Sequence, residues 1–197
     1  KLAREENCLH EIERITLFKA SEAFLAMKEK GMVRPNQLMF VNSIANQCLT
    51  EEEAAEFEER YSVLLPRIVI EIVEEEDMDM AALERKKRVN NGSGVFALDD
   101  YGSGYNSEKC LLLLAPKYIK VDLSIIRDID TDVDKQQLVL NLVDYAHKRD
   151  MKIVAEGLEN AAELKKVLEL GVDLLQGFYL ARPMAEPAPV TPAALSV

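Results

Sequence analysis

Hydrophobic residues fall along the chain in short runs that are separated by longer amphipathic segments. The short runs are rich in Val, Ile and Leu, as expected of strands buried on both faces of a parallel sheet. We predict six strands, at Leu38–Asn42, Ile68–Ile72, Val95–Asp99, Tyr118–Asp122, Lys152–Ala155 and Leu174–Gln176. The other segments place apolar residues at helical spacing and predict helices at Glu11–Lys30, Glu51–Leu64, Asp79–Val89, Ser107–Leu114, Asp132–Arg149 and Ala161–Leu170.

Strands that alternate with helices pair in parallel and are joined by right-handed crossovers. Two α/β architectures have this order, an open doubly wound sheet and a (β/α)8 barrel. No G-x-G-x-x-G turn follows an early strand, and a barrel needs two strand–helix units beyond these six. We expect one domain over residues 1–185. The last residues, Glu186–Val197, are rich in Pro and Ala without periodicity, which predicts a linker or disordered tail.

The composition is that of an acidic globular protein. Hydrophobic residues make up 48% of the 197 positions, enough for a sizeable core. The net charge of -11 argues against DNA or RNA as a partner, because no basic surface is available to neutralise phosphates. Cys8, Cys48 and Cys110 are widely spaced, which is typical of reduced thiols in a cytoplasmic protein. No apolar run has membrane-spanning length.

Each predicted strand carries a polar side chain at or near its carboxyl end, where parallel α/β folds collect their chemistry. These residues are Asn42, Glu71 (with Glu74 one turn later), Asp99 and Asp100, Lys120 and Asp122, Glu156, and Gln176. A polar group in an apolar strand costs about 1–3 kcal/mol unless it finds a partner. Carboxylate and amide oxygens suit Mg²⁺ or Mn²⁺, and a lysine among them suits water positioning or anion stabilisation.

The segment A-L-D-D-Y-G-S-G-Y, Ala97 to Tyr105, combines two adjacent carboxylates with two nearby glycines. Adjacent carboxylates repel each other, and a divalent metal cluster is the usual agent that offsets the repulsion. Gly102 and Gly104 let the backbone turn sharply or approach a ligand. The alternative is an Asp-rich turn that caps the next helix.

Short motifs surround these polar residues. They are V-N-S-I at Val41–Ile44, I-E-I-V-E at Ile70–Glu74, D-D-Y-G-S-G-Y-N-S at Asp99–Ser107, K-V-D at Lys120–Asp122, A-E-G-L-E-N at Ala155–Asn160 and Q-G-F-Y-L-A-R-P at Gln176–Pro183. In this order they resemble the motifs of the EAL domain, the bacterial phosphodiesterase domain of cyclic di-GMP signalling. The resemblance extends over about Lys1 to Met184.

The resemblance implies a modified TIM (β/α)8 barrel that hydrolyses one phosphodiester of cyclic di-GMP to linear pGpG. It implies that two Mg²⁺ or Mn²⁺ ions activate a water, held by Asn42, Glu71, Asp99, Asp100 and Glu156. It further places Lys120 beside the attacking water, Gln176 in the same site, and Glu74 as the anchor of the glycine loop, which contributes to dimerisation in the family.

The E-A-L signature itself is absent from the sequence. We therefore expect a barrel without its first two strands, and without the metal-binding glutamate and the phosphate-contacting arginine that accompany them. This predicts an active full-length parent and a weak or inactive isolated chain, with a second copy or other signalling domains as partners. Two alternatives are a non-catalytic module that binds nucleotide or protein, and a structural fold with solvated acids.

Overall fold

The computed structural model describes residues 6, 8–73, 80–89, 95–104 and 107–197. The chain divides into two compact units, Lys1–Ala97 and Leu98–Val197, which are described in turn. Strand β3 (Val95–Tyr101) runs through the boundary between them. Among the described residues, no helix combines the length and apolar character that a bilayer crossing requires.

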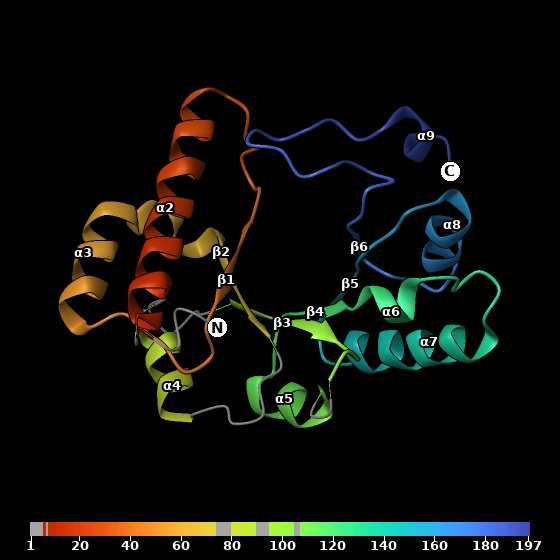
Figure 1. The fold of residues 1–197 in the computed structure, drawn as a ribbon, viewed down its shortest axis with the longest axis horizontal. Helices are drawn as coiled ribbons and strands as arrows, with labels where there is room; N and C mark the ends of the chain where they lie inside the picture. The colour runs from red at the N-terminus through yellow and green to blue at the C-terminus, as the bar shows by residue number, and fades with distance from the viewer. Residues whose placement is uncertain (1–5, 7, 74–79, 90–94, 105–106) are drawn as a thin grey trace. The chain divides into compact units, whose positions relative to one another are not determined.

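The first unit places helices beside a parallel strand pair (Figure 1). Its elements are α2 (Leu9–Glu29), β1 (Met39–Ser43), α3 (Glu51–Tyr61), the 3-10 helix η1 (Ser62–Arg67), β2 (Ile68–Val73) and α4 (Met80–Val89). The register of β1 and β2 aligns Met39 with Ile68 and Asn42 with Glu71. The carboxyl ends of the two strands therefore lie next to each other.

An aromatic contact and a buried ion pair connect the helices of the first unit to one another and to β1. Phe18 of α2 packs edge-on against Phe57 of α3, with ring centroids 5.2 Å apart. Glu13 of α2 and Lys86 of α4 form a buried ion pair, and Ser43 of β1 donates to Glu13 at 2.6 Å. Because each buried charge has an opposite charge as partner, the pair fixes α2 and α4 against β1 without an isolated ion.

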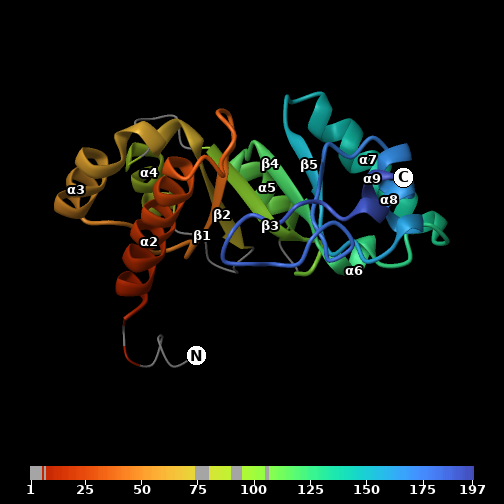
Figure 2. The ribbon, with the colours of Figure 1, turned by 90° about the horizontal axis from the view of Figure 1, so that it is seen from above.

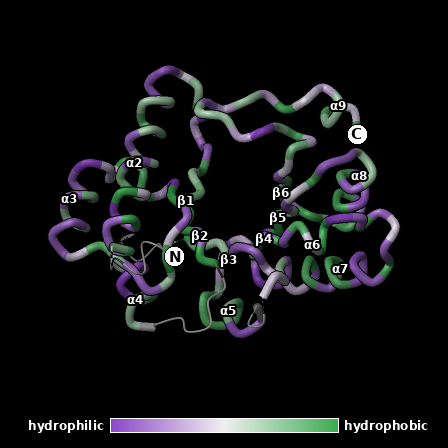
Figure 3. Tube along the Cα trace, viewed as in Figure 1, coloured by the Kyte–Doolittle hydropathy of each residue, from purple (hydrophilic) through white to green (hydrophobic). Residues whose placement is uncertain are grey.

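The second unit repeats the strand–helix order (Figure 2). After β3 come α5 (Ser107–Leu114), β4 (Tyr118–Val121), α6 (Leu123–Ile126), α7 (Val133–His147), β5 (Lys152–Ala155), α8 (Ala161–Glu169), β6 (Leu174–Leu175) and α9 (Pro192–Leu195). Strand β4 pairs in parallel with β5, and β5 with β6. Helix α7 alternates between hydrophobic and hydrophilic positions and contacts β5, so its apolar residues cover that strand (Figure 3).

Side-chain caps begin the helices of the second unit. Asp122 caps α6, Asp132 caps α7 and Asn160 caps α8, each accepting a hydrogen bond from a backbone amide of the first turn. Such a cap stabilises a helix by about 1 kcal/mol because it satisfies a donor that has no partner inside the helix. The caps of Asp122 and Asn160 fix the helix starts that follow β4 and β5, whereas Asp132 fixes the start of α7 after α6.

All six predicted strands are present, with small differences at their ends. Strand β3 continues to Tyr101, whereas Asp122 lies beyond β4 as the cap of a short helix that the sequence pattern did not predict. The predicted helix Glu51–Leu64 ends at Tyr61 and continues as the 3-10 helix η1, which contains Pro66. In the predicted tail, the helical turn α9 follows Thr191, whose amide donates to Leu180 O at 2.8 Å.

Asp173, just before β6, supports a prediction about acid stability. Burial alone would raise the pKa of Asp173, but hydrogen bonds from Lys152 and the Ile153 amide, with His147 nearby, lower the pKa to about 2. Because an unperturbed aspartate titrates near 3.8, the native carboxylate contributes stability above that pH and loses it as the pH falls toward about 2. Asp173→Asn should therefore lower the free energy of unfolding by about 2 kcal/mol near neutral pH.

Urea unfolding at several pH values measures this effect. The difference between wild type and Asp173→Asn should shrink as the pH falls through the range between 3.8 and about 2. The control is Asp144→Asn, which removes an exposed pair with Lys148 and should change stability by less than about 0.5 kcal/mol. A difference that stays constant with pH would contradict the assigned role of Asp173.

Candidate active site

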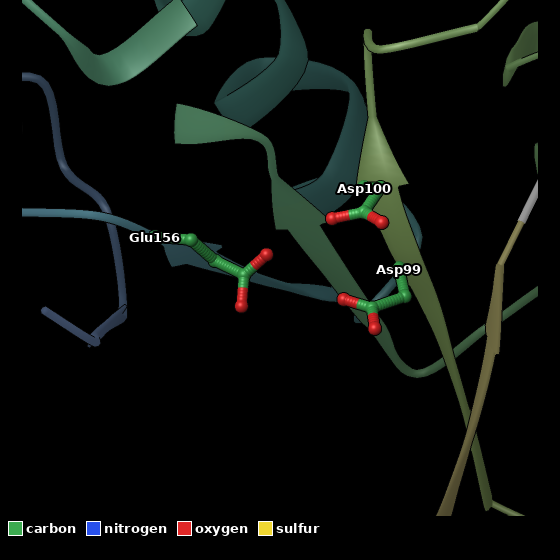
Figure 4. A group of neighbouring side chains, drawn as sticks. All are labelled: Asp99, Asp100 and Glu156. Atoms are coloured by element: carbon green, nitrogen blue, oxygen red, sulfur yellow. The ribbon is translucent and has the colours of Figure 1, made fainter. Parts of the chain in front are cut away.

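Three carboxylates of the second unit converge beyond the ends of two strands. Asp99 and Asp100 lie near the end of β3, and Glu156 follows β5 directly. One oxygen from each side chain lies within 4.8 Å of the others, and Figure 4 shows the three carboxylates pointing into the same space. The structure thus brings together three of the predicted metal ligands.

The backbone explains how consecutive residues can contribute to one cluster. Successive side chains of a regular strand point to opposite faces of the sheet. Asp100 instead has a φ of 55°, in the left-handed region, and the Ser103 amide donates to its carbonyl at 3.0 Å. The end of β3 is held to the end of β4 by the Asp122 amide, which donates to Tyr101 O at 3.1 Å.

Lys120 of β4 is the cation of the cluster. Its ammonium donates to Asp99 Oδ1 at 2.6 Å and lies 2.9 Å from Glu156 Oε1. Lys120 is 5% exposed and Asp99 is 8% exposed, so both charges are shielded from water. Three ionised carboxylates and one ammonium leave two negative charges without a partner inside the cluster. The structure thus places Lys120 among the carboxylates, and its predicted position beside the attacking water stays a prediction.

The protonation of two carboxylates reflects this excess of negative charge. Burial raises the pKa of Asp100, and the nearby charges of Asp99 and Asp122 raise it further. Burial also raises the pKa of Glu156, although the hydrogen bond and charge of Lys120 act in the opposite direction. A bound cation would favour the ionised forms of both side chains.

The donor set fits a hard divalent cation. All three side chains offer carboxylate oxygens, without sulfur or imidazole, and two negative charges are uncompensated. Mg²⁺ and Mn²⁺ prefer such oxygen ligands, whereas structural zinc sites use Cys and His. The residues present therefore fit the predicted metals by chemistry and by charge.

Two further predicted ligands belong to the first unit. Asn42 of β1 and Glu71 of β2 are register partners on the parallel pair. Asn42 is exposed, whereas Glu71 is 7% exposed and has an interaction partner of its own. The structure brings these two residues together within their unit. That they bind the same metal ions as Asp99, Asp100 and Glu156 stays a prediction. Glu74, the predicted loop anchor, lies outside the described residues.

Gln176 lines a cavity whose wall also includes Gly157, the residue that follows Glu156 of the carboxylate cluster. The backbone amide of Gln176 donates to the carbonyl oxygen of Ala155, one residue before Glu156, at 2.8 Å. The cavity, of about 280 Å³, is lined by Leu123, Arg127, Gly157, Glu159, Gln176, Gly177, Phe178, Ala181 and Pro183. A Cβ atom at Gly177 would lie 2.2 Å from Leu158 O, so only glycine permits this approach of the two cavity-lining segments.

Three charged residues near this cavity were missed by the sequence reasoning. Arg127 Nη1 lies 2.6 Å from Glu159 Oε2 and 3.8 Å from Glu163 Oε1. The hydrogen bond with Arg127 lowers the pKa of Glu159. The sequence contains one usable signal, the spacing Asn160-x-x-Glu163, which is typical of a capped helix start. Nothing in the sequence pattern pairs Arg127 with either glutamate.

The family model described as "EAL domain" matches residues 1–183. The chain belongs to the EAL domain family. The predicted resemblance to the EAL domain is thus confirmed, and the charged cluster lies in the part of the chain that the family model covers.

Known EAL proteins resemble this chain in sequence and in fold. The bifunctional diguanylate cyclase/cyclic di-GMP phosphodiesterase MucR of Pseudomonas aeruginosa is 32% identical over 130 residues, 64% of this chain and 18% of that protein. The probable cyclic di-GMP phosphodiesterase PdeG of Escherichia coli is 28% identical over 68% of this chain and 27% of its own length. The matched segments therefore span about a fifth to a quarter of these relatives.

Comparison with solved structures confirms the fold class. A standalone EAL protein from Vibrio cholerae O395, solved in its c-di-GMP-bound form, superposes with a TM-score of 0.79 at 26% identity. The match covers 96% of this chain and 81% of that one. The parallel strands with covering helices are consistent with a partial (β/α)8 barrel of the modified TIM type.

The charge balance of the cluster yields a prediction for Lys120→Met. Removal of one partner from a buried ion cluster leaves uncompensated charge and destabilises a fold by about 3–5 kcal/mol. We expect a lower melting temperature without divalent cations and a larger stabilisation by Mn²⁺ than in the wild type, because the variant cluster is more negative. Thermal unfolding with and without Mn²⁺ measures both effects.

Lys117→Met is the matched control for this experiment. Lys117 pairs with Asp150, whose side chain is 93% exposed, and lies outside the cluster. Its loss should leave the Mn²⁺-dependent shift at the wild-type value. An equal Mn²⁺ shift in Lys120→Met and Lys117→Met would show that Lys120 does not set the charge of a metal-binding cluster.

Proposed function

We propose that the chain carries the catalytic residues of a metal-dependent phosphodiesterase that hydrolyses cyclic di-GMP to linear pGpG in bacterial signalling. The observation that carries the proposal is the cluster of Asp99, Asp100 and Glu156 around the Lys120 ammonium in an EAL domain. The names of relatives as cyclic di-GMP phosphodiesterases support the substrate. The c-di-GMP-bound state of the Vibrio cholerae protein supports the same ligand.

The metal shell in this proposal consists of Asp99, Asp100 and Glu156, with Asn42 and Glu71 as further ligands. Mg²⁺ or Mn²⁺, once bound, would lower the pKa of a bound water and neutralise charge on the phosphate. The cation also reverses the local field, which a chain of net charge -11 needs in order to accept an anionic ligand.

The remaining residues position the reactants. Lys120 fixes the carboxylates of Asp99 and Glu156 from within the cluster, so neither reorients when charge develops on the phosphate. The adjoining cavity has apolar walls at Leu123 and Phe178 and polar groups at Glu159 and Gln176. This mixture suits a nucleobase, which has apolar faces and a hydrogen-bonding edge.

The setting of the domain follows from the same proposal. Cyclic di-GMP signalling in the cytoplasm agrees with the three cysteines, which form no disulfide among the described residues. The proposed partners are a second copy of the chain or other signalling domains on the same polypeptide. The relatives, which are several times longer than the matched segments, are compatible with companion domains.

Asp99→Asn tests the proposed activity. The substitution keeps the shape of the side chain but removes the charge that binds both Lys120 and metal, and it should lower kcat/KM by at least about 100-fold. The measurement is the formation of pGpG from cyclic di-GMP in Mg²⁺ or Mn²⁺ by a longer polypeptide that contains this chain, with Asp144→Asn, which changes an exposed aspartate paired with Lys148, as control.

Binding and turnover separate this proposal from the non-catalytic alternative. Binding of cyclic di-GMP by the wild-type chain is measured with Ca²⁺ in place of Mg²⁺. If the wild type binds the nucleotide but saturating Mg²⁺ or Mn²⁺ gives no turnover, in this chain and in a longer polypeptide that contains it, the domain is a binding module. If Asp99→Asn hydrolyses as fast as the wild type, the assigned site is wrong.

A further inference from the structure

Glu163, in the first turn of α8, is a carboxylate with 0% exposure. The start of α8 does not require its side chain, because Asn160 already caps the helix by accepting from the Glu163 amide at 2.9 Å. A buried carboxylate is costly unless hydrogen bonds and a cation compensate it. The buried Glu163 carboxylate therefore has a role other than capping α8.

The two oxygens of Glu163 accept hydrogen bonds from two separate segments. Oε2 accepts from the Glu159 amide at 2.9 Å, in the segment that follows β5. Oε1 accepts from the Asp128 amide at 3.3 Å, just after α6. The Arg127 guanidinium lies 3.8 Å from the same Oε1. One side chain thus ties the segment after β5 to the segment after α6.

Both tied segments line the cavity beside the carboxylate cluster. Arg127 and Glu159 face each other there at 2.6 Å, and Gly157 of the same segment follows Glu156 directly. The side chain of Arg127 is 33% exposed and that of Glu159 is 49% exposed, so solvent screening weakens this pair when it acts alone. The buried Glu163 carboxylate, which binds the backbone amides beside both residues, restricts the positions of Arg127 and Glu159 more firmly than their exposed ion pair does.

We propose that Glu163 is a positioning residue for the ligand, which fixes Arg127 and Glu159 in the cavity wall. The inference deepens the proposed function and rests on it for the identity of the ligand. The ligand portion that enters the cavity contacts this wall, whereas the metal-binding carboxylates act on the phosphate. Loss of the positioning should therefore weaken binding far more than it slows the chemical step.

Glutamine reproduces the hydrogen bonding of this carboxylate only in part. A carboxylate accepts at both oxygens, whereas an amide accepts at one position and donates at the other. In Glu163→Gln, one of the Glu159 and Asp128 amides would face an NH₂ group, and the charge beside Arg127 would be lost. The Asn160 cap would remain, because it uses the backbone amide of residue 163.

The experiment compares Glu163→Gln with Glu169→Gln, a change of equal charge at the exposed end of α8, where Glu169 pairs with Lys166. Steady-state hydrolysis of cyclic di-GMP should show KM raised about 5- to 50-fold in Glu163→Gln, with kcat within about 2-fold of the wild type. Glu169→Gln should match the wild type in both. A chain without turnover is assayed by its dissociation constant for cyclic di-GMP in Ca²⁺.

Amide hydrogen exchange followed by NMR tests the positioning without any ligand. In Glu163→Gln, at least one of the Asp128 and Glu159 amides loses its acceptor and should exchange about 10-fold faster or more, while the amide of residue 163, held by Asn160, keeps its protection. This readout decides the structural part of the inference even if the wild type fails to bind cyclic di-GMP, a result that would overturn the proposed function instead.

Two results would overturn the inference. Unchanged protection of the Asp128 and Glu159 amides would show that Glu163 does not fix these segments. Faster exchange with unchanged KM or affinity would show that its role is confined to stability. If Glu163→Gln does not fold, Arg127→Gln, at a partly exposed position, should give the same rise in KM with unchanged kcat.

Discussion

The ammonium of Lys120 constrains the chemistry of the second unit. Parallel pairing of β4 with β5 brings the ends of these strands to one edge, and the carboxylates of Asp99 and Glu156 meet there at 2.6 and 2.9 Å from Nζ. Without this cation, carboxylates with so little solvent would protonate or move apart. Its charge and hydrogen bonds hold the two carboxylates close together and favour the ionised form of Glu156 against the effect of burial.

The strands and the carboxylate cluster could be predicted from sequence because each depends on a simple regularity. A run such as Ile68–Ile72 is apolar apart from Glu71, as expected of a parallel strand that is covered on both faces. Parallel strands share the direction of their carboxyl ends, so Asp99 and Glu156 were expected together although 57 positions separate them. The EAL motifs added the roles that geometry alone does not assign.

The rest depended on interactions that no periodicity encodes. Asp122 was expected at a strand end, yet it caps α6, because a helix of four residues leaves no repeating apolar pattern. Glu163 has the spacing of an ordinary capping residue, and only the folded chain shows that its oxygens bind amides of two segments.

The left-handed backbone of Asp100 limits which residues can replace it over evolutionary time. Asn and Gly adopt such a conformation readily, whereas β-branched residues do so only at considerable cost. A lineage that no longer needs catalysis could replace Asp100 by Asn or Gly, discard a carboxylate and leave the turn intact. Inactive descendants of such a domain could thus inherit the complete fold and be retained as nucleotide sensors.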